Sequence, residues 1–542
     1  MNRPVAISAI AVVLLSATAC TDDDTTSGTT SAPRSIGVDP RSYFDDYVEE
    51  EEELVFAIEE SPEPLADEGG VVEPPPAPEP IPPEVTEDNT FVDAGQSVWT
   101  ATADDAESTF ALDVDTGSFS IARRFVAEGF VPEPDSIRPE EWINSFDYGD
   151  PAAIETDLAA TVELGQAPYA GEAVELVRVG VTTRTIAAED RPPASLTFVV
   201  DTSGSMDIRE RLGLVQASLA LLAEQLNDDD TIAIVTYGSD ARALLPPTPA
   251  SDTQTIVSAI NRLVSGGSTN MEAGLRTGYA QARASFREDG VNTVILASDG
   301  VANVGVDDPD GLAGLIEQSG SDGIALVTVG YGMGNFNDDL MEQLADQGDG
   351  FYSYIDTFEE AERLFVDDLT PTLTVVAADA KVQVVFDPAV VEEYRLIGYE
   401  NRSLDDSEFR DDTTDASELG AGHAATALYE IRRTADGDGL SPGEVRLRWE
   451  STASGAVVET ETPIPAEPTA DPTDAFQLAA LVATAAEVLR QDPVRVERSI
   501  TAAQLATDAK ALVDAGVTEA DEIAALLAAV APFLQVPAEG QD

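Results

Sequence analysis

The middle of the chain alternates short apolar runs with stretches in which apolar residues recur every three or four positions. Apolar runs of this length are typical of buried strands, and the three-to-four spacing is typical of one face of a helix. The pattern predicts strands over 196–200, 231–237, 240–245, 291–298, 324–329 and 351–355. It predicts helices over 208–226, 256–263, 271–286, 308–318, 337–346 and 358–369. This alternation implies an α/β fold with a doubly wound, mostly parallel sheet covered on both faces.

Both flanks of this α/β unit show the alternation of apolar and polar residues that half-buried strands have. Strands are predicted there over 158–164, 173–186, 381–386, 425–432 and 444–449. We expect the strands before and after the α/β unit to pair in one β-sandwich, with the α/β unit inserted between them. After residue 465 the composition shifts to Ala and Leu, which predicts a small region of short packed helices. The apolar runs of that region are too short to span a membrane.

Polar residues follow two of the central strands and precede one of the helices. Asp201, Ser203 and Ser205 come directly after the first apolar run. Thr269 lies in a Gly-rich loop before a predicted helix, and Asp299 follows a later apolar run. Alternate side chains of an extended segment share a face, and ligands of parallel sheets gather at the carboxyl ends of the strands. Carboxylate and hydroxyl oxygens are hard ligands, so the pattern predicts a site for Mg²⁺ or a similar divalent cation.

The order of D-x-S-x-S, a threonine loop and an S-D-G strand end resembles the metal-ion-dependent adhesion site (MIDAS) of von Willebrand factor type A (VWA) domains. The resemblance implies that Ser203, Ser205 and Thr269 coordinate Mg²⁺ (or Mn²⁺ or Ca²⁺) through their hydroxyls, while Asp201 and Asp299 act directly or through water. It also implies that an Asp or Glu carboxylate of a protein partner completes the coordination shell. The single histidine lies far along the chain, so we expect a binding protein and not an enzyme.

Further motifs extend the resemblance beyond the metal site. Segments within 108–148 are similar to the N-terminal flank of a family of bacterial VWA lipoproteins, and segments within 394–431 are similar to its C-terminal flank. The predicted organisation is a lipoprotein signal peptide (1–20), an acidic Pro-rich tether (21–89), an N-terminal flanking domain (90–190), a VWA domain (191–372), a β-rich C-terminal flanking domain (373–466) and a helical C-terminal region (467–542).

The first 20 residues predict export. A short basic start, a short apolar core and small residues precede Cys20, which is typical of a secretory signal. A cysteine at the first mature position resembles a bacterial lipoprotein signal; an ordinary signal peptide with an incidental cysteine is the alternative. Residues 21–89 are rich in acidic residues and proline, which predicts a solvated tether, although 43–58 holds enough aromatic and aliphatic residues to fold on a partner. We therefore expect a protein anchored by lipid in the cell envelope, outside the cytoplasm.

The formal net charge of −73 restricts the partners. An acidic surface repels nucleic acid phosphates and anionic lipid headgroups. We therefore expect no nucleic acid partner, and contact with the membrane through the N-terminal lipid alone.

Two other functions stay open. One is a structural scaffold of an envelope complex without reversible metal-dependent binding. The other is an envelope hydrolase, because Asp113 and Asp115 form a D-x-D-x-T motif that resembles the nucleophile signature of haloacid-dehalogenase-type phosphatases. Such enzymes need a lysine beside the phosphoryl group, and neither Lys381, in a predicted strand, nor Lys510, in the terminal helices, is placed for that role. His423 lacks the partners of a triad or a zinc site, so we interpret it as structural.

Overall fold

The computed structural model describes residues 34–48, 91–92, 95–112, 114–171, 173–187, 190–300, 309–332, 338–368, 373–414 and 416–534. Cys20, with the rest of the predicted signal, and Asp113 lie outside the described residues. So does most of the predicted tether.

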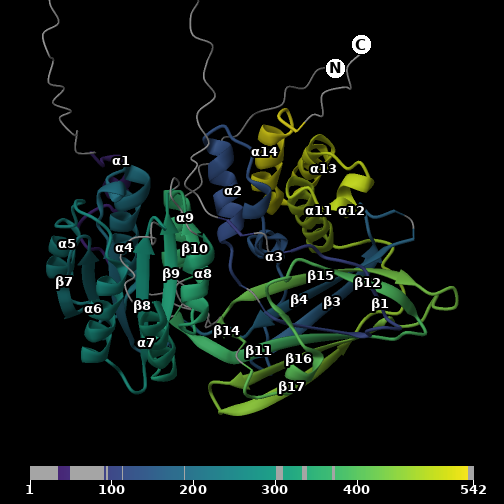
Figure 1. Ribbon diagram of the computed structural model, residues 1–542, viewed down its shortest axis with the longest axis horizontal. Coiled ribbons are helices and arrows are strands. Elements are labelled where there is room, and N and C mark those ends of the chain that lie inside the picture. Colours follow the sequence, from purple (N-terminus) through teal and green to yellow (C-terminus); the bar gives the residue numbers. More distant parts are fainter. Residues whose placement is uncertain are drawn as a thin grey trace, which may run out of the picture. The chain divides into compact units, whose positions relative to one another are not determined.

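The α/β unit contains a six-stranded sheet with the order β10-β9-β8-β5-β6-β7 (Figure 1). Its strands are β5 (Ala194–Asp201), β6 (Thr231–Tyr237), β7 (Ala241–Pro249), β8 (Val291–Ser298), β9 (Ala325–Tyr331) and β10 (Tyr352–Ile355). All neighbours are parallel except β7, which pairs antiparallel with β6 at the edge. The mostly parallel sheet predicted from the apolar runs is confirmed.

Helices cover both faces of this sheet, because successive side chains of each strand point to opposite sides. Leu196, Phe198 and Val200 of β5 belong to one apolar core, and Val199 belongs to another. The helices are α4 (Leu214–Gln225), α5 (Thr253–Ile260), α6 (Met271–Ala284), α7 (Pro309–Ser321), α8 (Asp338–Asp346) and α9 (Phe358–Glu362). Two predicted helices are only partly α-helical. The first begins with a π-helical turn, η3 (Arg209–Gly213), before α4, and the last ends with a π-helical turn, η4 (Arg363–Asp367), after α9.

The flanks form two further sheets, ordered β1-β12-β15-β4-β3 and β13-β2-β11-β16-β17, with β14 paired to β11. The strands before the α/β unit are β1 (Thr100–Ala101), β2 (Glu107–Ala111), β3 (Leu158–Gln166) and β4 (Glu175–Thr183). Those after it are β11 (Val375–Phe386), β12 (Val391–Ile397), β13 (Ser403–Leu404), β14 (Ser417–Gly420), β15 (Ala424–Arg433), β16 (Gly443–Ser451) and β17 (Ala456–Pro463).

The two sheets are built from both flanks, as the sandwich hypothesis requires. In one sheet β4 pairs with β15, placing Val177 opposite Tyr429, and in the other β2 pairs with β11, placing Phe110 opposite Val382. All four of these side chains lie in one shared apolar core. The hypothesis that strands on either side of the α/β unit complete one sandwich is confirmed, so the two flanking segments form one folded part.

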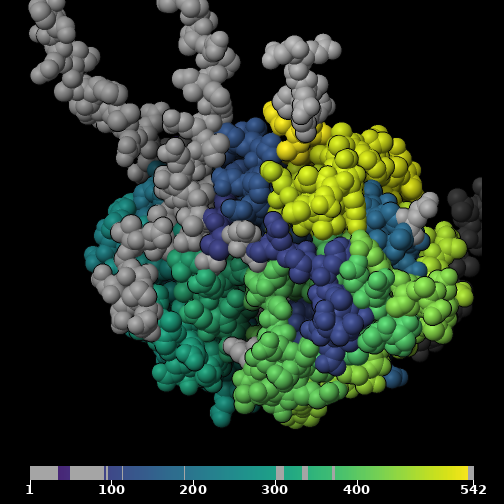
Figure 2. All heavy atoms as spheres, turned by 45° about the vertical axis from the view of Figure 1, so that its right-hand side comes forward, coloured from purple at the N-terminus to yellow at the C-terminus, as the bar shows by residue number. Residues whose placement is uncertain are grey.

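The C-terminal region consists of α11 (Asp474–Leu489), α12 (Pro493–Glu497), α13 (Ala502–Ala515) and α14 (Asp521–Val530). These helices share a core with α2 (Gly117–Ala127) and α3 (Pro139–Asn144) of the N-terminal flank. Figure 2 shows this adjacency, with the yellow C-terminal helices beside the blue flank segment. Within the described part of the chain, no helix has the length and apolar character needed to cross a bilayer.

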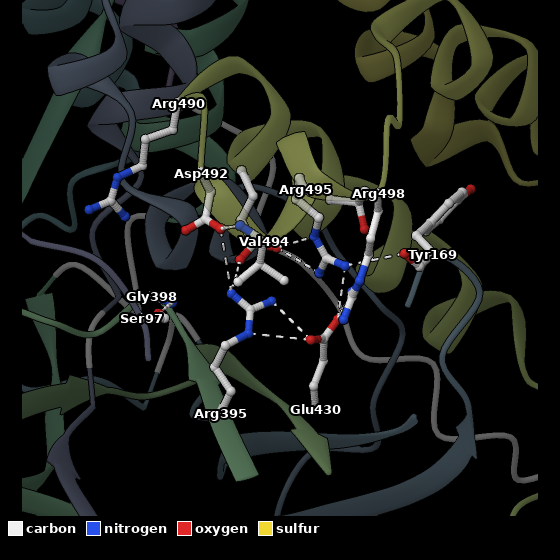
Figure 3. Close-up of polar contacts among 12 residues, drawn as sticks. Ser97, Tyr169, Arg395, Gly398, Glu430, Arg490, Asp492, Val494, Arg495 and Arg498 are labelled. Carbon is white, nitrogen blue, oxygen red and sulfur yellow. Dashed lines mark hydrogen bonds and ion pairs between the residues drawn. The ribbon is translucent and has the colours of Figure 1, made fainter. Parts of the chain in front are cut away.

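A buried network of charges ties these helices to the sandwich (Figure 3). Arg395 of β12 pairs with Glu430 of β15 at 3.0 Å and with Glu487 of α11 at 2.5 Å. Arg495 of α12 reaches the same two carboxylates, at 2.9 and 2.6 Å. Burial would raise the pKa of Glu430, but the charges of Arg495 and Arg395 lower it below its ordinary value.

The structure corrects the prediction for residues 34–48, which we call the N-terminal strap. The sequence assigned them to a solvated tether, whereas they form α1 (Pro40–Asp45) and pack on the α/β unit. Ile36 is buried in its core, the Tyr43 hydroxyl donates to Asn261 Oδ1 at 2.8 Å, and the Tyr47 hydroxyl donates to Asp207 Oδ1 at 2.8 Å. The surrounding acidic and proline residues dominate the composition of 21–89 and conceal this short apolar face.

Candidate metal centre

Asp201 is the last residue of β5, and its side chain is fully buried. Its Oδ1 accepts the backbone N–H of Ser203 at 2.8 Å, and its Oδ2 accepts the hydroxyl of Ser298 at 3.2 Å. Burial and, to a smaller extent, the negative charge of Asp299 raise the pKa of Asp201 to about 6. The carboxylate is therefore held in place by neutral donors in a position where its charge is unfavourable.

The two serines of D-x-S-x-S present their hydroxyls side by side. The backbone after Ser203 turns into η2 (Gly204–Met206), a single 3₁₀ turn, and the Oγ atoms of Ser203 and Ser205 lie 3.0 Å apart. Adjacent ligands of an octahedral Mg²⁺ ion are separated by about 3 Å when each lies roughly 2.0–2.1 Å from the metal. The hydroxyl spacing therefore fits neighbouring positions of such a shell.

The loop that carries Thr269 is joined to the loop of the serines by backbone hydrogen bonds. Gly266 N donates to Thr202 O at 2.7 Å, and Gly204 N donates to Gly267 O at 3.2 Å. Gly267 has φ +96°, and a Cβ there would lie 2.8 Å from Ser239 Oγ, so glycine suits this position. These bonds bring Thr269, which is buried, to the carboxyl end of the sheet beside the serines.

Asp299 follows β8 directly and is fully buried. Its Oδ2 accepts a hydrogen bond from Arg211 Nη1 at 2.9 Å, and the same nitrogen donates to Ser205 O at 2.5 Å. Arg211 was not among the residues predicted for the site. It lies in a stretch whose apolar spacing predicts a regular helix, and the π-helical turn that directs it to Asp299 leaves no mark in that spacing.

The donor set fits a hard divalent cation. It offers carboxylate and hydroxyl oxygens at the carboxyl ends of neighbouring parallel strands, and the buried Asp201 has no cationic partner among the described residues. Within the described ranges, no group of three or more His, Cys, Asp or Glu side chains is placed to hold a metal ion. In the predicted ligand set, the hydroxyls of Ser203, Ser205 and Thr269 would supply part of the shell.

Asp115, the acidic residue of the D-x-D-x-T motif that lies within the described part of the chain, has a structural role. Asp115 is buried, accepts the backbone N–H of Tyr352 at 3.0 Å and pairs with Arg402 at 3.3 Å. Lys381 lies in β11 opposite Ala111 of β2, and its Nζ donates to Asp411 O at 2.8 Å. Asp115 and Lys381 thus both have partners within the protein, while Asp113, the other acidic residue of the motif, lies outside the described residues.

The other two isolated basic residues also have local partners. His423 accepts the backbone N–H of Gly420 through Nδ1 at 3.2 Å, and burial lowers its pKa to about 4. Lys510 pairs with Asp514 at 3.2 Å on the exposed side of α13. Both contacts fit the structural interpretation made from the sequence.

Comparison with known families assigns three parts of the chain. The family model for the von Willebrand factor type A domain matches residues 195–367, the model for "Uncharacterized protein YfbK, C-terminal" matches 371–441, and the model described as "von Willebrand factor" matches 85–178. The first match spans the sheet that carries the candidate metal centre.

Two uncharacterized proteins are similar to parts of this chain. The chain is 42% identical over 332 residues to the uncharacterized protein YfbK of Escherichia coli K12, covering 60% of this chain and 58% of YfbK. It is 29% identical over 189 residues to the uncharacterized protein sll0103 of Synechocystis, covering 35% of this chain and 44% of that protein. The chain thus spans about half the length of these curated relatives.

The solved structures are less similar to this chain in sequence. A von Willebrand factor type A protein from Catenulispora acidiphila is 18% identical, with a TM-score of 0.39, and the match covers 61% of this chain and 79% of that one. The ArnB paralog VWA2 from Sulfolobus acidocaldarius is 13% identical, with a TM-score of 0.34 and coverage of 69% and 97%. Together these matches show that the chain contains a VWA domain, followed by a segment that matches the YfbK C-terminal family, and that it is similar to YfbK over 332 residues.

Proposed function

We propose that this protein binds a divalent cation, Mg²⁺ or a similar ion, and through it an acidic group of a protein partner. The residues that would hold the cation are Asp201, Ser203, Ser205, Thr269 and Asp299. The observation that carries the proposal is the pair of serine hydroxyls, 3.0 Å apart, beside a buried aspartate held by neutral donors. When bound, the cation supplies a positive charge with coordination positions open to an external carboxylate.

The surrounding residues position these groups. The N–H of Ser203 and the hydroxyl of Ser298 fix the two oxygens of the Asp201 carboxylate, and the glycine turn at Gly266 and Gly267 ties the Thr269 loop to the serines. Among the described residues, the titratable groups that interact with the site are its two aspartates, Arg211 and Tyr237, and they do not form a nucleophile–base pair. This chemistry favours binding over turnover.

We also propose that the protein is anchored by lipid at Cys20 in the cell envelope, on the basis of the signal pattern in residues 1–20. Replacing this residue, Cys20→Ser, should move the protein from the membrane fraction to the extracytoplasmic soluble fraction. A variant that stays with the membrane would contradict lipid anchoring while leaving the metal proposal unchanged.

The metal proposal is tested first by calorimetric titration of the full chain with Mg²⁺ and with Mn²⁺. Asp201→Ala and Thr269→Val should lose binding, whereas Asp514→Ala, an exposed aspartate of α13, should bind as the parent does. Absence of binding by the parent chain at millimolar metal would refute the proposal.

The partner is tested by affinity capture from envelope extract on the immobilised full chain, with Mg²⁺ and with EDTA. Capture of an acidic partner segment should require Mg²⁺ and should fail with Asp201→Ala. Capture indifferent to both would place partner binding on the flanks and favour the scaffold role.

A further inference from the structure

Arg211 contacts the candidate metal centre and is held there by its surroundings. Its side chain is buried, and its Nη1 bridges Asp299 Oδ2, at 2.9 Å, and Ser205 O, at 2.5 Å. Gly332, at φ +71°, packs against the same side chain, and a Cβ there would lie 2.5 Å from Arg211 Cγ. The guanidinium is therefore a fixed part of the site's charge.

The charges of the site can be counted from these residues. Two carboxylates, Asp201 and Asp299, face one guanidinium, which leaves one net negative charge. A divalent cation changes this to one net positive charge, which one incoming carboxylate neutralises. Without the guanidinium, the same site would be neutral with the cation alone, and an incoming carboxylate would leave it negative.

We propose that Arg211 weakens binding of a divalent cation alone and strengthens binding of a carboxylate to the cation-bound site. The inference rests on the proposed metal-binding function. In the metal-free protein Arg211 neutralises Asp299 and so weakens binding of the cation alone. Once the cation is bound, the same positive charge favours a carboxylate over a neutral ligand, which makes the site selective for acidic partners.

Neighbouring charges supply a matched control. Arg209 lies on the same π-helical turn but is exposed and pairs with Glu210, at 2.5 Å. Its charge is cancelled by that partner and screened by solvent, so Arg209→Gln should leave the site unchanged. Arg211→Gln removes the charge at the site, and Arg211→Lys retains it.

The test is calorimetric titration of the full chain with Mn²⁺, in sodium chloride and in sodium acetate at equal ionic strength and constant pH. For the parent chain, acetate should tighten Mn²⁺ binding at least about fivefold, within the range typical of coupled sites. Arg211→Gln should bind Mn²⁺ more tightly than the parent in chloride, and acetate should have less than about a twofold effect on it. Arg211→Lys should restore part of the acetate effect that Arg211→Gln loses, and Arg209→Gln should behave as the parent does.

The possible failures differ from one another. Mn²⁺ binding by the parent chain without any enhancement by acetate would overturn the inference, whether or not the glutamine variant folds. An equal response of the parent chain and Arg211→Gln would also overturn it and leave the proposed function standing. Failure of the parent chain to bind Mn²⁺ would refute the proposed function itself.

Discussion

Replacing the buried Asp201 by asparagine should stabilise the metal-free protein while abolishing its response to metal. The amide keeps the oxygen that accepts the N–H of Ser203, and its NH₂ group can donate to the hydroxyl of Ser298. Only the negative charge is lost. The variant therefore isolates the cost of holding an unneutralised carboxylate in the interior.

The magnitude follows from the pKa of Asp201, which burial and the charge of Asp299 raise from the ordinary 3.8 to about 6. At about 1.36 kcal/mol per pH unit, ionised Asp201 costs the folded state about 3 kcal/mol. Well below pH 3.8 the carboxyl is protonated in both folded and unfolded states, so parent and variant should be equally stable there. As the pH rises from 4 to 6 the parent should lose stability relative to the variant, and the difference should be constant above that range.

The assay must report on the VWA domain alone, since several folded parts need not unfold together. The three tryptophans, Trp99, Trp142 and Trp449, all lie in the flanks, so their fluorescence does not report on this domain. Hydrogen exchange of peptides from β5 and α4, measured by mass spectrometry in EDTA, reports on the VWA domain directly. Equal protection of parent and Asp201→Asn at pH 7.5 would refute the reasoning, and so would a difference that does not depend on pH between 4 and 7.

Added Mg²⁺ at a thousandfold excess over its dissociation constant should make the parent more stable than Asp201→Asn. A ligand that binds only the folded state stabilises it by about 4.1 kcal/mol at that excess, which exceeds the cost of about 3 kcal/mol. The parent should gain protection in β5 and α4, and Asp201→Asn should not.

Three further predictions, with five variants, test packing and polar contacts in other parts of the molecule. Gly278→Ala in α6 should destabilise the protein by about 1–3 kcal/mol, because the added Cβ would overlap a valine methyl of β5. Gly314→Ala in α7, where the space is open, should stabilise the protein by about 0.5–1 kcal/mol. Shifts of the melting temperature with the same sign for both variants would contradict this. Glu430→Gln should lower stability by about 3–5 kcal/mol, because it removes the negative charge that pairs with two buried arginines. Lys510→Ala, at an exposed ion pair, should lower stability by less than about 1 kcal/mol. Amide hydrogen exchange rates in α11 check this. Tyr47→Phe should loosen the N-terminal strap by about 0.5–1.5 kcal/mol and speed its proteolysis, and unchanged cleavage would mean that its hydrogen bond contributes nothing.

The central sheet could be predicted because each strand is buried on both faces. Val291–Ser298 and Thr231–Tyr237 have the bounds that their apolar runs indicated, since a strand covered by helices on both faces is mostly apolar along its length. The candidate ligands were found for a related reason. Asp201 and Asp299 stand where such runs stop, and the carboxyl ends of parallel strands meet at one edge.

What the sequence concealed depends on distances that no local pattern contains. The approach of Arg211 to Asp299 requires a π-helical turn, which the three-to-four spacing of apolar residues does not distinguish from a regular helix. The strap was missed because a single turn of aromatic residues, around Tyr43, carries little weight in a strongly acidic segment. The pairing of β4 with β15 was expected, but its register rests on contacts between residues about 250 positions apart.

Three buried aspartates end strands of the VWA sheet, and they differ in the partners of their carboxylates. Asp356, after β10, is bound by Arg123 of α2 through two bonds of 3.1 and 2.5 Å. Asp299, after β8, is bound by Arg211. Asp201, on the central strand β5, has an amide and a hydroxyl as partners, and it carries the raised pKa of about 6. A buried charge without a counter-charge is costly unless an ion joins it, so the carboxylate that lacks an arginine, and that has two serine hydroxyls beside it, is where a cation gains the most.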